Sequence, residues 1–220
     1  MPDRRPALFF DFDNTITCGD VLDTLIERYS ATGEWREWEA MWQEGRMSTV
    51  ECLSRQVGGL RIGPEALQCS MLEVVIDPHF APIVAWAGAS GVELEILSDN
   101  FSSLIRVILE NHGLGSVPVF ANELGLHEGR YQAQFPWRDP GCARCAHCKA
   151  QHLRAARERP RIFVGDGLSD VCPSLVADVV FAKGSLAAEL SRRGVAFTEF
   201  RTLEEVLQVL RSSYGTPAAA

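Results

Sequence analysis

Positive charge is scarce in this chain. Its 21 Lys and Arg residues are outnumbered by 29 Asp and Glu residues, which gives a formal net charge of -8. Sequence-independent binding of nucleic acid depends on basic side chains that neutralise phosphates, so this composition argues against a nucleic-acid partner. A small anionic ligand remains compatible with it, because a bound metal ion can reverse the local field.

Long hydrophobic runs are also missing. No 18 apolar residues follow one another, and the apolar run at 7–10 is too short for the core of a signal peptide. Gly and Pro are not in excess, and no internal repeat or low-complexity segment occurs. With 46% hydrophobic residues, the chain has enough material for one sizeable core and a small second module. We therefore expect a folded cytoplasmic protein without a membrane partner.

Short apolar runs alternate with segments of helical periodicity over most of the chain. Strands are expected at residues 7–12, 92–97, 117–120, 161–164 and 178–182, with a hairpin at 123–135. Helices are expected at residues 102–111, 146–157, 186–193 and 203–210. This alternation predicts an α/β fold with a mainly parallel sheet.

Residues 20–72 show only helical spacing, which predicts several short helices. Trp35, Trp38 and Trp42 lie on one face of one of them. Tryptophans at this spacing favour burial in the core. An aromatic cage for a quaternary ammonium group is the alternative.

Acidic residues follow two of the expected strands. Asp11 and Asp13 end the first strand, and Asp166 and Asp170 follow the strand at 161–164. In open parallel sheets, ligands bind beyond the carboxyl ends of the strands. Paired carboxylates there can perform nucleophilic and proton-transfer chemistry, and acids next to glycines can hold a hard cation such as magnesium.

Two further groups suit a phosphate. Ser98, at the end of the strand at 92–97, offers a hydroxyl, and Lys149, near a helix start, offers a point cation. The order D-x-D-x-T, Ser, Lys and G-D-G-x-x-D resembles the four motifs of the haloacid dehalogenase superfamily of phosphatases. The resemblance spans nearly the whole chain.

The resemblance implies a role for each matched residue. Asp11 would attack phosphorus and form an aspartyl-phosphate, while Asp13 would act as general acid and base. The carboxylates of Asp11 and Asp166 and the backbone carbonyl of Asp13 would bind magnesium, supported by Asp170 in the second shell. The phosphoryl group would be held by three residues, Ser98, Asp99 and Lys149.

The same resemblance implies a Rossmann-like three-layer core with a small helical cap inserted after the first strand. Residues 1–15 and 79–220 would form the core and residues 16–78 the cap. Specificity would then depend on Asp20, Gln56 and Asp99. Asp20 matches an acidic residue of phosphoserine phosphatases but is equally suited to capping a helix at Val21. Asp99 can likewise serve a cationic or hydroxylated substrate or a helix N-terminus.

Two departures separate the chain from phosphoserine phosphatases. Gln56 stands where those enzymes have an arginine for the substrate carboxylate, and Ser98-Asp99-Asn100 replaces their Ser-Gly-Gly. The second motif and the nearby cysteines look more like the phosphoethanolamine/phosphocholine phosphatases and the diketo-methylthio-phosphopentane (MtnX-like) phosphatases. We expect a small-molecule phosphate ester as the partner. A catalytically silent binding protein and a phosphotransferase are the alternatives.

The cysteines show no disulfide framework, because there are seven of them. Cys142, Cys145 and Cys148 have C-x-x-C-x-x-C spacing, and His152 lies one helical turn beyond the last of them. Three thiolates and one imidazole would make a tetrahedral structural zinc site. The second C-x-x-C half of a typical zinc module is missing, so reduced thiols that only shape the loop are the alternative. A zinc ion here would fix the loop that carries Lys149.

Overall fold

A parallel sheet with one antiparallel edge strand organises the molecule. The computed structural model describes residues 5–142 and 145–215, so parts of the predicted core (1–4, 143–144 and 216–220) lie outside the described residues. Within them the sheet has seven strands in the order β4-β3-β2-β1-β5-β6-β7, and only β3 and β4 pair antiparallel. The strands are β1 (Ala7–Phe10), β2 (Glu93–Phe101), β3 (Val119–His127), β4 (Arg130–Gln134), β5 (Arg161–Gly165), β6 (Val179–Ala182) and β7 (Thr198–Glu199).

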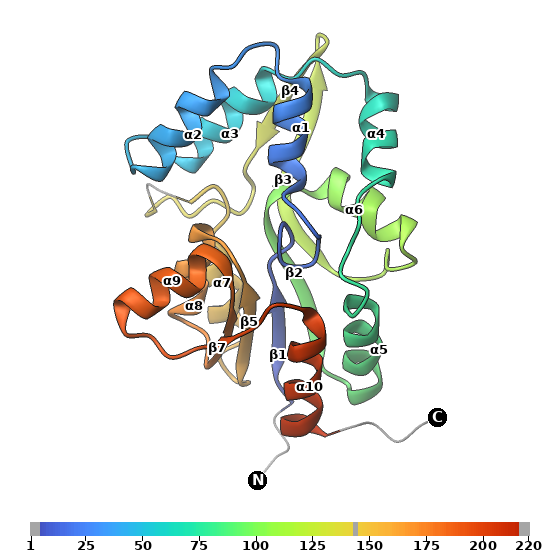
Figure 1. Ribbon diagram of the computed structural model, residues 1–220, viewed down its shortest axis with the longest axis vertical. Coiled ribbons are helices and arrows are strands. Elements are labelled where there is room, and N and C mark those ends of the chain that lie inside the picture. The colour runs from blue at the N-terminus through green and yellow to red at the C-terminus, as the bar shows by residue number, and fades with distance from the viewer. Residues whose placement is uncertain (1–4, 143–144, 216–220) are drawn as a thin grey trace.

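The helices divide into two groups. Four of them form the helical insertion between β1 and β2, namely α1 (Val21–Tyr29), α2 (Trp35–Gln43), α3 (Thr49–Gly58) and α4 (Pro64–Leu72). The others are α5 (Phe80–Ser90), α6 (Ser102–Asn111), α7 (Lys149–Ala155), the 3-10 turn η1 (Leu168–Asp170), α8 (Val171–Ser174), α9 (Gly184–Arg193) and α10 (Leu203–Tyr214). α5 and α6 lie on one side of the central strands and α7, α8 and α9 on the other (Figure 1).

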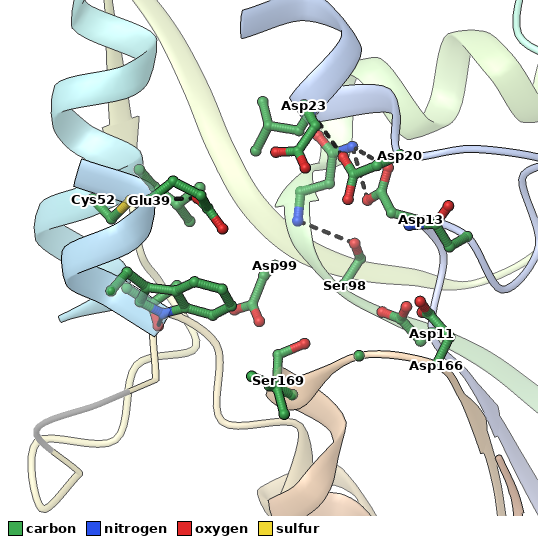
Figure 2. Close-up of a pocket in the computed structure, with 18 of the residues that line it drawn as sticks. Asp11, Asp13, Asp20, Asp23, Glu39, Cys52, Ser98, Asp99, Asp166 and Ser169 are labelled. Carbon is green, nitrogen blue, oxygen red and sulfur yellow. Dashed lines mark hydrogen bonds between the residues drawn. The ribbon is translucent and has the colours of Figure 1, made fainter. Parts of the chain in front are cut away.

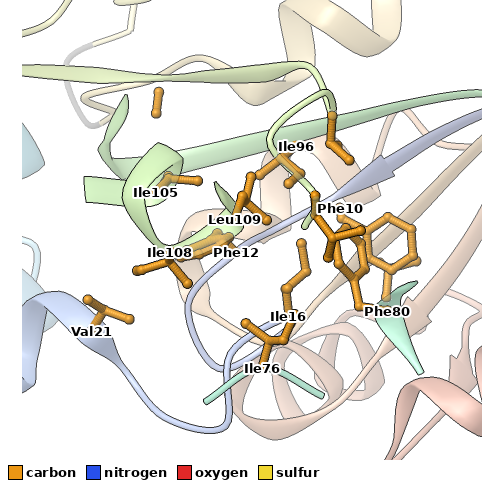
Figure 3. Packing of buried hydrophobic residues seen from close by; sticks show 14 of the residues in the cluster. Phe10, Phe12, Ile16, Val21, Ile76, Phe80, Ile96, Ile105, Ile108 and Leu109 are labelled. Atoms are coloured by element: carbon orange, nitrogen blue, oxygen red, sulfur yellow. The ribbon is translucent and has the colours of Figure 1, made fainter. Parts of the chain in front are cut away.

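Side-chain alternation along β1 buries both faces of the sheet. Leu8 and Phe10 belong to the large core cluster that includes residues of α5, α6 and α10, whereas Phe9 belongs to a second cluster with Leu153 of α7. The ring of Phe10 meets that of Phe80 edge to face, with centroids 5.5 Å apart (Figure 3). Truncation of such a buried Phe to Ala typically costs about 3–5 kcal/mol. Burial on both faces explains why β1 reads as a continuous apolar run.

The helical insertion is tied to the sheet at its base. A β-bridge pairs Thr17 with Ile76, so the two chain segments that connect the insertion to the core lie side by side. On its other side, α3 packs against β4, the outer strand of the hairpin (Figure 1). The division of the chain at residues 15/16 and 78/79 remains a prediction.

Some expectations differ in detail from the structure. The strand expected at 92–97 continues to Phe101, with a register shift against β3 between Ser98 and Phe101. The helix expected at 146–157 begins only at Lys149, and the short β7 was not expected at all. The tryptophans of α2 are half-buried instead of fully buried: Trp35 packs against the large core cluster, as expected, whereas Trp42 lines a cavity.

Candidate active site

A cavity of about 440 Å³ lies between the carboxyl ends of the strands and the helical insertion. It collects the acidic residues that follow β1 and β5, those at the end of β2, and several residues of α1, α2 and α3. Its lining includes Asp11, Asp13, Asp20, Asp23, Glu39, Trp42, Gln56, Ser98, Asp99, Asn100, Lys149, Asp166 and Ser169 (Figure 2). The fold thus brings together residues separated by more than 150 positions.

Asp11 and Lys149 form the centre of the site. Asp11 continues directly from β1, and its backbone N–H donates to the carbonyl of Val164 in β5 at 2.9 Å. Lys149 is the first residue of α7, and its Nζ lies 2.5 Å from Oδ1 of Asp11 and 2.7 Å from Oδ1 of Asp170. All three side chains are buried. Burial opposes the lysine's charge, but the carboxylates of Asp11, Asp170 and Asp99 raise its pKa well above the ordinary value.

Asp170 holds the loop that follows β5. Its Oδ2 accepts hydrogen bonds from the backbone N–H groups of Asp166 and Gly167, each at 3.1 Å. Gly165 makes room for this carboxylate, because a Cβ at that position would lie 2.5 Å from the same oxygen. The side chain of Asp166 is fixed separately, by a 3.1 Å hydrogen bond from the hydroxyl of Thr15.

The donor set fits a divalent cation. Asp11, Asp166 and Asp170 each place a carboxylate oxygen so that all three lie within 4.8 Å of one another. Burial and then Asp170 raise the pKa of Asp11 well above its ordinary value, and the same two causes raise that of Asp166 to about 6. One lysine does not balance three clustered carboxyl groups, so a magnesium ion would relieve their repulsion, and oxygen ligands are those it prefers.

Asp13 links the core to the helical insertion. Its carboxylate accepts a hydrogen bond from the backbone N–H of Val21, at the start of α1, at 2.9 Å. It also accepts from the side-chain amide of Asn100, at 3.0 and 3.1 Å. Burial and the nearby charge of Asp20 raise the pKa of Asp13 to about 8, despite these hydrogen bonds. The carboxyl group is therefore suited to carry a proton at neutral pH.

The end of β2 supplies Ser98 and Asp99. Ser98 is buried, lines the cavity, and its Oγ accepts a hydrogen bond from the backbone N–H of Asn100. Asp99 accepts from the backbone N–H of His147 at 3.0 Å and from Ser169. His147 in turn contacts the carbonyl of Ser98 through Nδ1, and burial lowers its pKa to about 3. A neutral, buried His147 therefore holds the loop before Lys149 against the end of β2.

The part of the cavity formed by the helical insertion is also acidic. Asp20 caps α1 by accepting from the backbone N–H of Asp23 at 2.8 Å, and it also lines the cavity. Its role in substrate specificity stays a prediction. Asp23 and Glu39 project into the space opposite Asp11 (Figure 2). Gln56 is buried and donates to Glu39 at 3.2 Å, so it orients an acid of the cavity.

The cysteine-rich loop precedes Lys149 in the chain and leads directly into α7. Cys142, Cys145 and Cys148 precede α7, as the sequence indicates. His152 lies instead near two other groups, because its Nε2 is 3.0 Å from Nε2 of His147 and its Nδ1 is 4.0 Å from Glu95. The thiol of Cys145 contacts Cys142 and also Cys172, a residue of α8 that the sequence pattern did not suggest.

Comparison with known families agrees with this geometry. The profile of the haloacid dehalogenase-like hydrolases matches residues 8–172. The chain belongs to this family. The match begins in β1 and ends just after Asp170, so it covers the region that contains the carboxylates and Lys149.

Several curated relatives are phosphatases. The chain is 28% identical to a 2-hydroxy-3-keto-5-methylthiopentenyl-1-phosphate phosphatase of Brevibacillus brevis, over 94% of this chain and 96% of the relative. It is 23% identical to a polyol phosphate phosphatase of Saccharomyces cerevisiae, with 94% and 93% covered. It is 26% identical to a thiamine phosphate phosphatase-like protein of Arabidopsis thaliana, with 77% and 75% covered.

Solved structures show the same fold. A substrate-bound phosphoserine phosphatase superposes with a TM-score of 0.72 at 18% identity, covering 94% of this chain and 98% of the other. A phospho-aspartyl intermediate analogue of phosphoserine phosphatase gives 0.71 at 19% identity, covering 94% and 99%. The chain therefore has the fold of the phosphoserine phosphatases, within the family of the haloacid dehalogenase-like hydrolases. None of its described helices is long and apolar enough to cross a membrane.

Proposed function

We propose that the protein is a magnesium-dependent phosphomonoesterase that works through an aspartyl-phosphate on Asp11. The observation that carries the proposal is the buried arrangement of Asp11, Asp166, Asp170 and Lys149 at the carboxyl end of the sheet. The carboxylates of Asp11 and Asp166 and the carbonyl of Asp13 would hold the ion. Bound magnesium would neutralise charge on the phosphoryl oxygens and help to fix their orientation.

The protein's own groups account for the two chemical steps. A carboxylate oxygen of Asp11 attacks phosphorus, the bond to the ester oxygen breaks, and Asp13 donates its proton to the leaving oxygen. Asp13 then removes a proton from water, whose oxygen attacks phosphorus and releases Asp11 and inorganic phosphate. Lys149 and the hydroxyl of Ser98 would stabilise the phosphoryl oxygens throughout.

The remaining acids suggest what lies beyond the phosphate. Asp20, Asp23, Glu39 and Asp99 all line the cavity, while Lys149 is the one basic residue among the lining residues that the structure describes. A substrate with a second anionic group, such as phosphoserine, would find no positive partner there. We infer a substrate with a cationic or hydroxylated group near its phosphate, for which Asp20 and Asp99 would be specificity residues and Gln56 would orient Glu39.

Phosphate release from a panel of esters tests the function. Purified full-length protein with magnesium should hydrolyse small phosphate monoesters, and Asp11→Asn should reduce turnover by at least a thousandfold because it removes the nucleophile. Asp178→Asn is the matched control, since Asp178 pairs with Arg161 away from the cavity and should retain turnover. Normal turnover by Asp11→Asn would contradict the covalent role.

A matched set of three esters tests the substrate class. Phosphoethanolamine carries an ammonium group, 2-hydroxyethyl phosphate replaces it with a hydroxyl, and phosphoserine adds a carboxylate. We expect kcat/KM to fall in this order. A dominant rate with phosphoserine would overturn the substrate class but would leave the phosphatase function intact.

A further inference from the structure

The cysteine-rich loop and α8 bring four cysteines to one region of the protein. Cys142, Cys145 and Cys148 come from the loop, and Cys172 comes from α8, 24 positions after the last of them. The thiol of Cys145 makes hydrogen-bonding contacts with both Cys142 and Cys172, and Cys148 ends the same loop, three positions after Cys145. A further contact, from the backbone N–H of Cys145 to Sγ of Cys142, is 3.5 Å long.

We propose that these four cysteines form a structural zinc site in which Cys172 is the fourth ligand. Structural zinc prefers four tetrahedral ligands, often thiolates, and C-x-x-C spacing supplies pairs of them from one short segment. The pattern in the loop supplies three, and the fold supplies the fourth from a separate element. His152 has other neighbours for both ring nitrogens, His147 and Glu95, so it is not needed as a ligand.

The proposed site has a clear structural purpose. Cys148 immediately precedes Lys149, and Cys172 follows Asp170 by two residues. Lys149 and Asp170 form the buried ion pair of the active site, and α7 packs against α8 behind it. A zinc ion shared by the two segments would therefore fasten together the two chain segments that hold this pair.

The thiols are near one another but do not yet form a closed ligand set. Among the described residues, the one group with three or more ligand atoms all within 4.8 Å is the aspartate group of the active site. Binding of zinc would bring the four thiols closer together than they lie in this structure. Deprotonation of the thiols and completion of the ligand set would both be coupled to binding, as in other structural zinc sites.

Metal analysis of the full-length protein tests this proposal independently of phosphatase activity. The protein, produced with added zinc and dialysed against metal-free buffer, should contain about one zinc per chain by mass spectrometry. Cys172→Ser should retain less than half of it, whereas His152→Gln should retain it fully. Cys69→Ser is the matched control, because Cys69 is exposed on α4 and should have no effect.

Cobalt provides a second readout that reports the ligands directly. Protein loaded with Co²⁺ alone should show intense thiolate-to-cobalt absorption, weakened in both Cys172→Ser and Cys142→Ser. Added zinc should raise the melting temperature of the wild type but not of Cys172→Ser, so a folding defect in the variant can be recognised.

The proposal is overturned if the wild type holds no zinc, if Cys172→Ser retains zinc while His152→Gln loses it, or if Cys145 and Cys172 form a disulfide.

Discussion

Lys149 and Asp170 form a buried ion pair, with the lysine Nζ 2.7 Å from Oδ1 of the aspartate. The same ammonium group reaches Asp11, so one cation serves two buried carboxyl groups from two different loops. A buried charge is stable only when it is paired, and removal of one partner leaves the other uncompensated. The pair is thus a point at which catalysis and stability depend on the same atoms.

Replacement of Lys149 should reveal this dependence. We expect Lys149→Met to lower the free energy of unfolding by about 3 kcal/mol in chelator, because two carboxyl groups lose their partner. Magnesium should reduce that loss, since the ion compensates the same carboxylates. Urea unfolding with chelator and with magnesium measures both values. Arg192→Met is the control, since Arg192 forms an exposed ion pair with Glu189 on α9 and should lose less than about 1 kcal/mol in either buffer. Equal losses in the two buffers would contradict the shared role.

Glu39 should control the preference for a cationic substrate. Glu39→Gln keeps an acceptor for the amide of Gln56 but removes the negative charge that faces the cavity. We expect kcat/KM for phosphoethanolamine to fall about tenfold, consistent with the loss of a charged hydrogen bond, while that for 2-hydroxyethyl phosphate changes less than about twofold. Glu37→Gln is the matched control, because Glu37 is exposed on the same helix. Parallel losses for both esters would rule out charge recognition by Glu39.

Asp20 should make that preference depend on pH. Burial, and then the charge of Asp23, raise the pKa of Asp20 to about 6, while Asp13 and Asp23 are its acidic neighbours. A raised pKa means that Asp20 is charged above about pH 6 and becomes neutral below it. The ratio of kcat/KM for phosphoethanolamine to that for 2-hydroxyethyl phosphate should therefore fall as the pH drops from 7.5 to 5. Both kcat/KM values are expressed per phosphate dianion, because the ammonium group of phosphoethanolamine lowers the second pKa of its phosphate and the two esters therefore titrate differently.

Asp20→Asn isolates this effect from helix capping. Asparagine caps helices about as well as aspartate, so the variant should keep the stability of α1. It should also show a lower ratio that no longer changes near pH 6. An unchanged pH dependence in this variant would assign the titration to another group.

Gly165 should be irreplaceable for steric reasons. A Cβ there would lie 2.5 Å from Oδ2 of Asp170 and 2.8 Å from the ring of Phe163, so Gly165→Ala must displace one of them. We expect a loss of about 2–3 kcal/mol in urea unfolding. Gly167→Ala is the control: its φ is -106° and its nearest neighbour would be 3.8 Å away, so its stability should change by less than about 0.5 kcal/mol. If both variants lost a similar free energy of unfolding, the cause would be the lost backbone freedom of glycine and not the steric clash at Gly165.

The sheet and its catalytic edge were predictable because their signals are local. The apolar run at 7–10 and the acids after it follow one another in the sequence, and a parallel sheet aligns the carboxyl ends of its strands. The α/β fold is confirmed. The roles of the individual site residues remain predictions, although the structure brings Asp11, Lys149, Asp166 and Asp170 together.

Other contacts depend on how distant elements pack, which no local pattern reveals. Asn100 reaches Asp13 over 87 positions, and Glu39 joins the cavity only because α2 lies across it from the sheet. Cys172 carries no spacing signal relative to the cysteines of the loop, since it meets Cys145 only when α8 packs against α7. The tryptophans of α2 have the periodicity of core residues, but only Trp35 packs against the large core cluster, while Trp42 faces the cavity.

The hydrogen bond from Val21 to Asp13 joins the proton-transfer group to the first turn of α1. The same helix carries Asp20 at its cap and Asp23 in its first turn, both in the wall of the cavity. The bridge between Thr17 and Ile76 pairs the two chain segments that connect the insertion to the core, and the first of these segments leads from Asp13 into α1. A substrate that contacts Asp20 or Asp23 would therefore also act on the hydrogen bond from Val21 to Asp13, and through that bond on the pKa of Asp13.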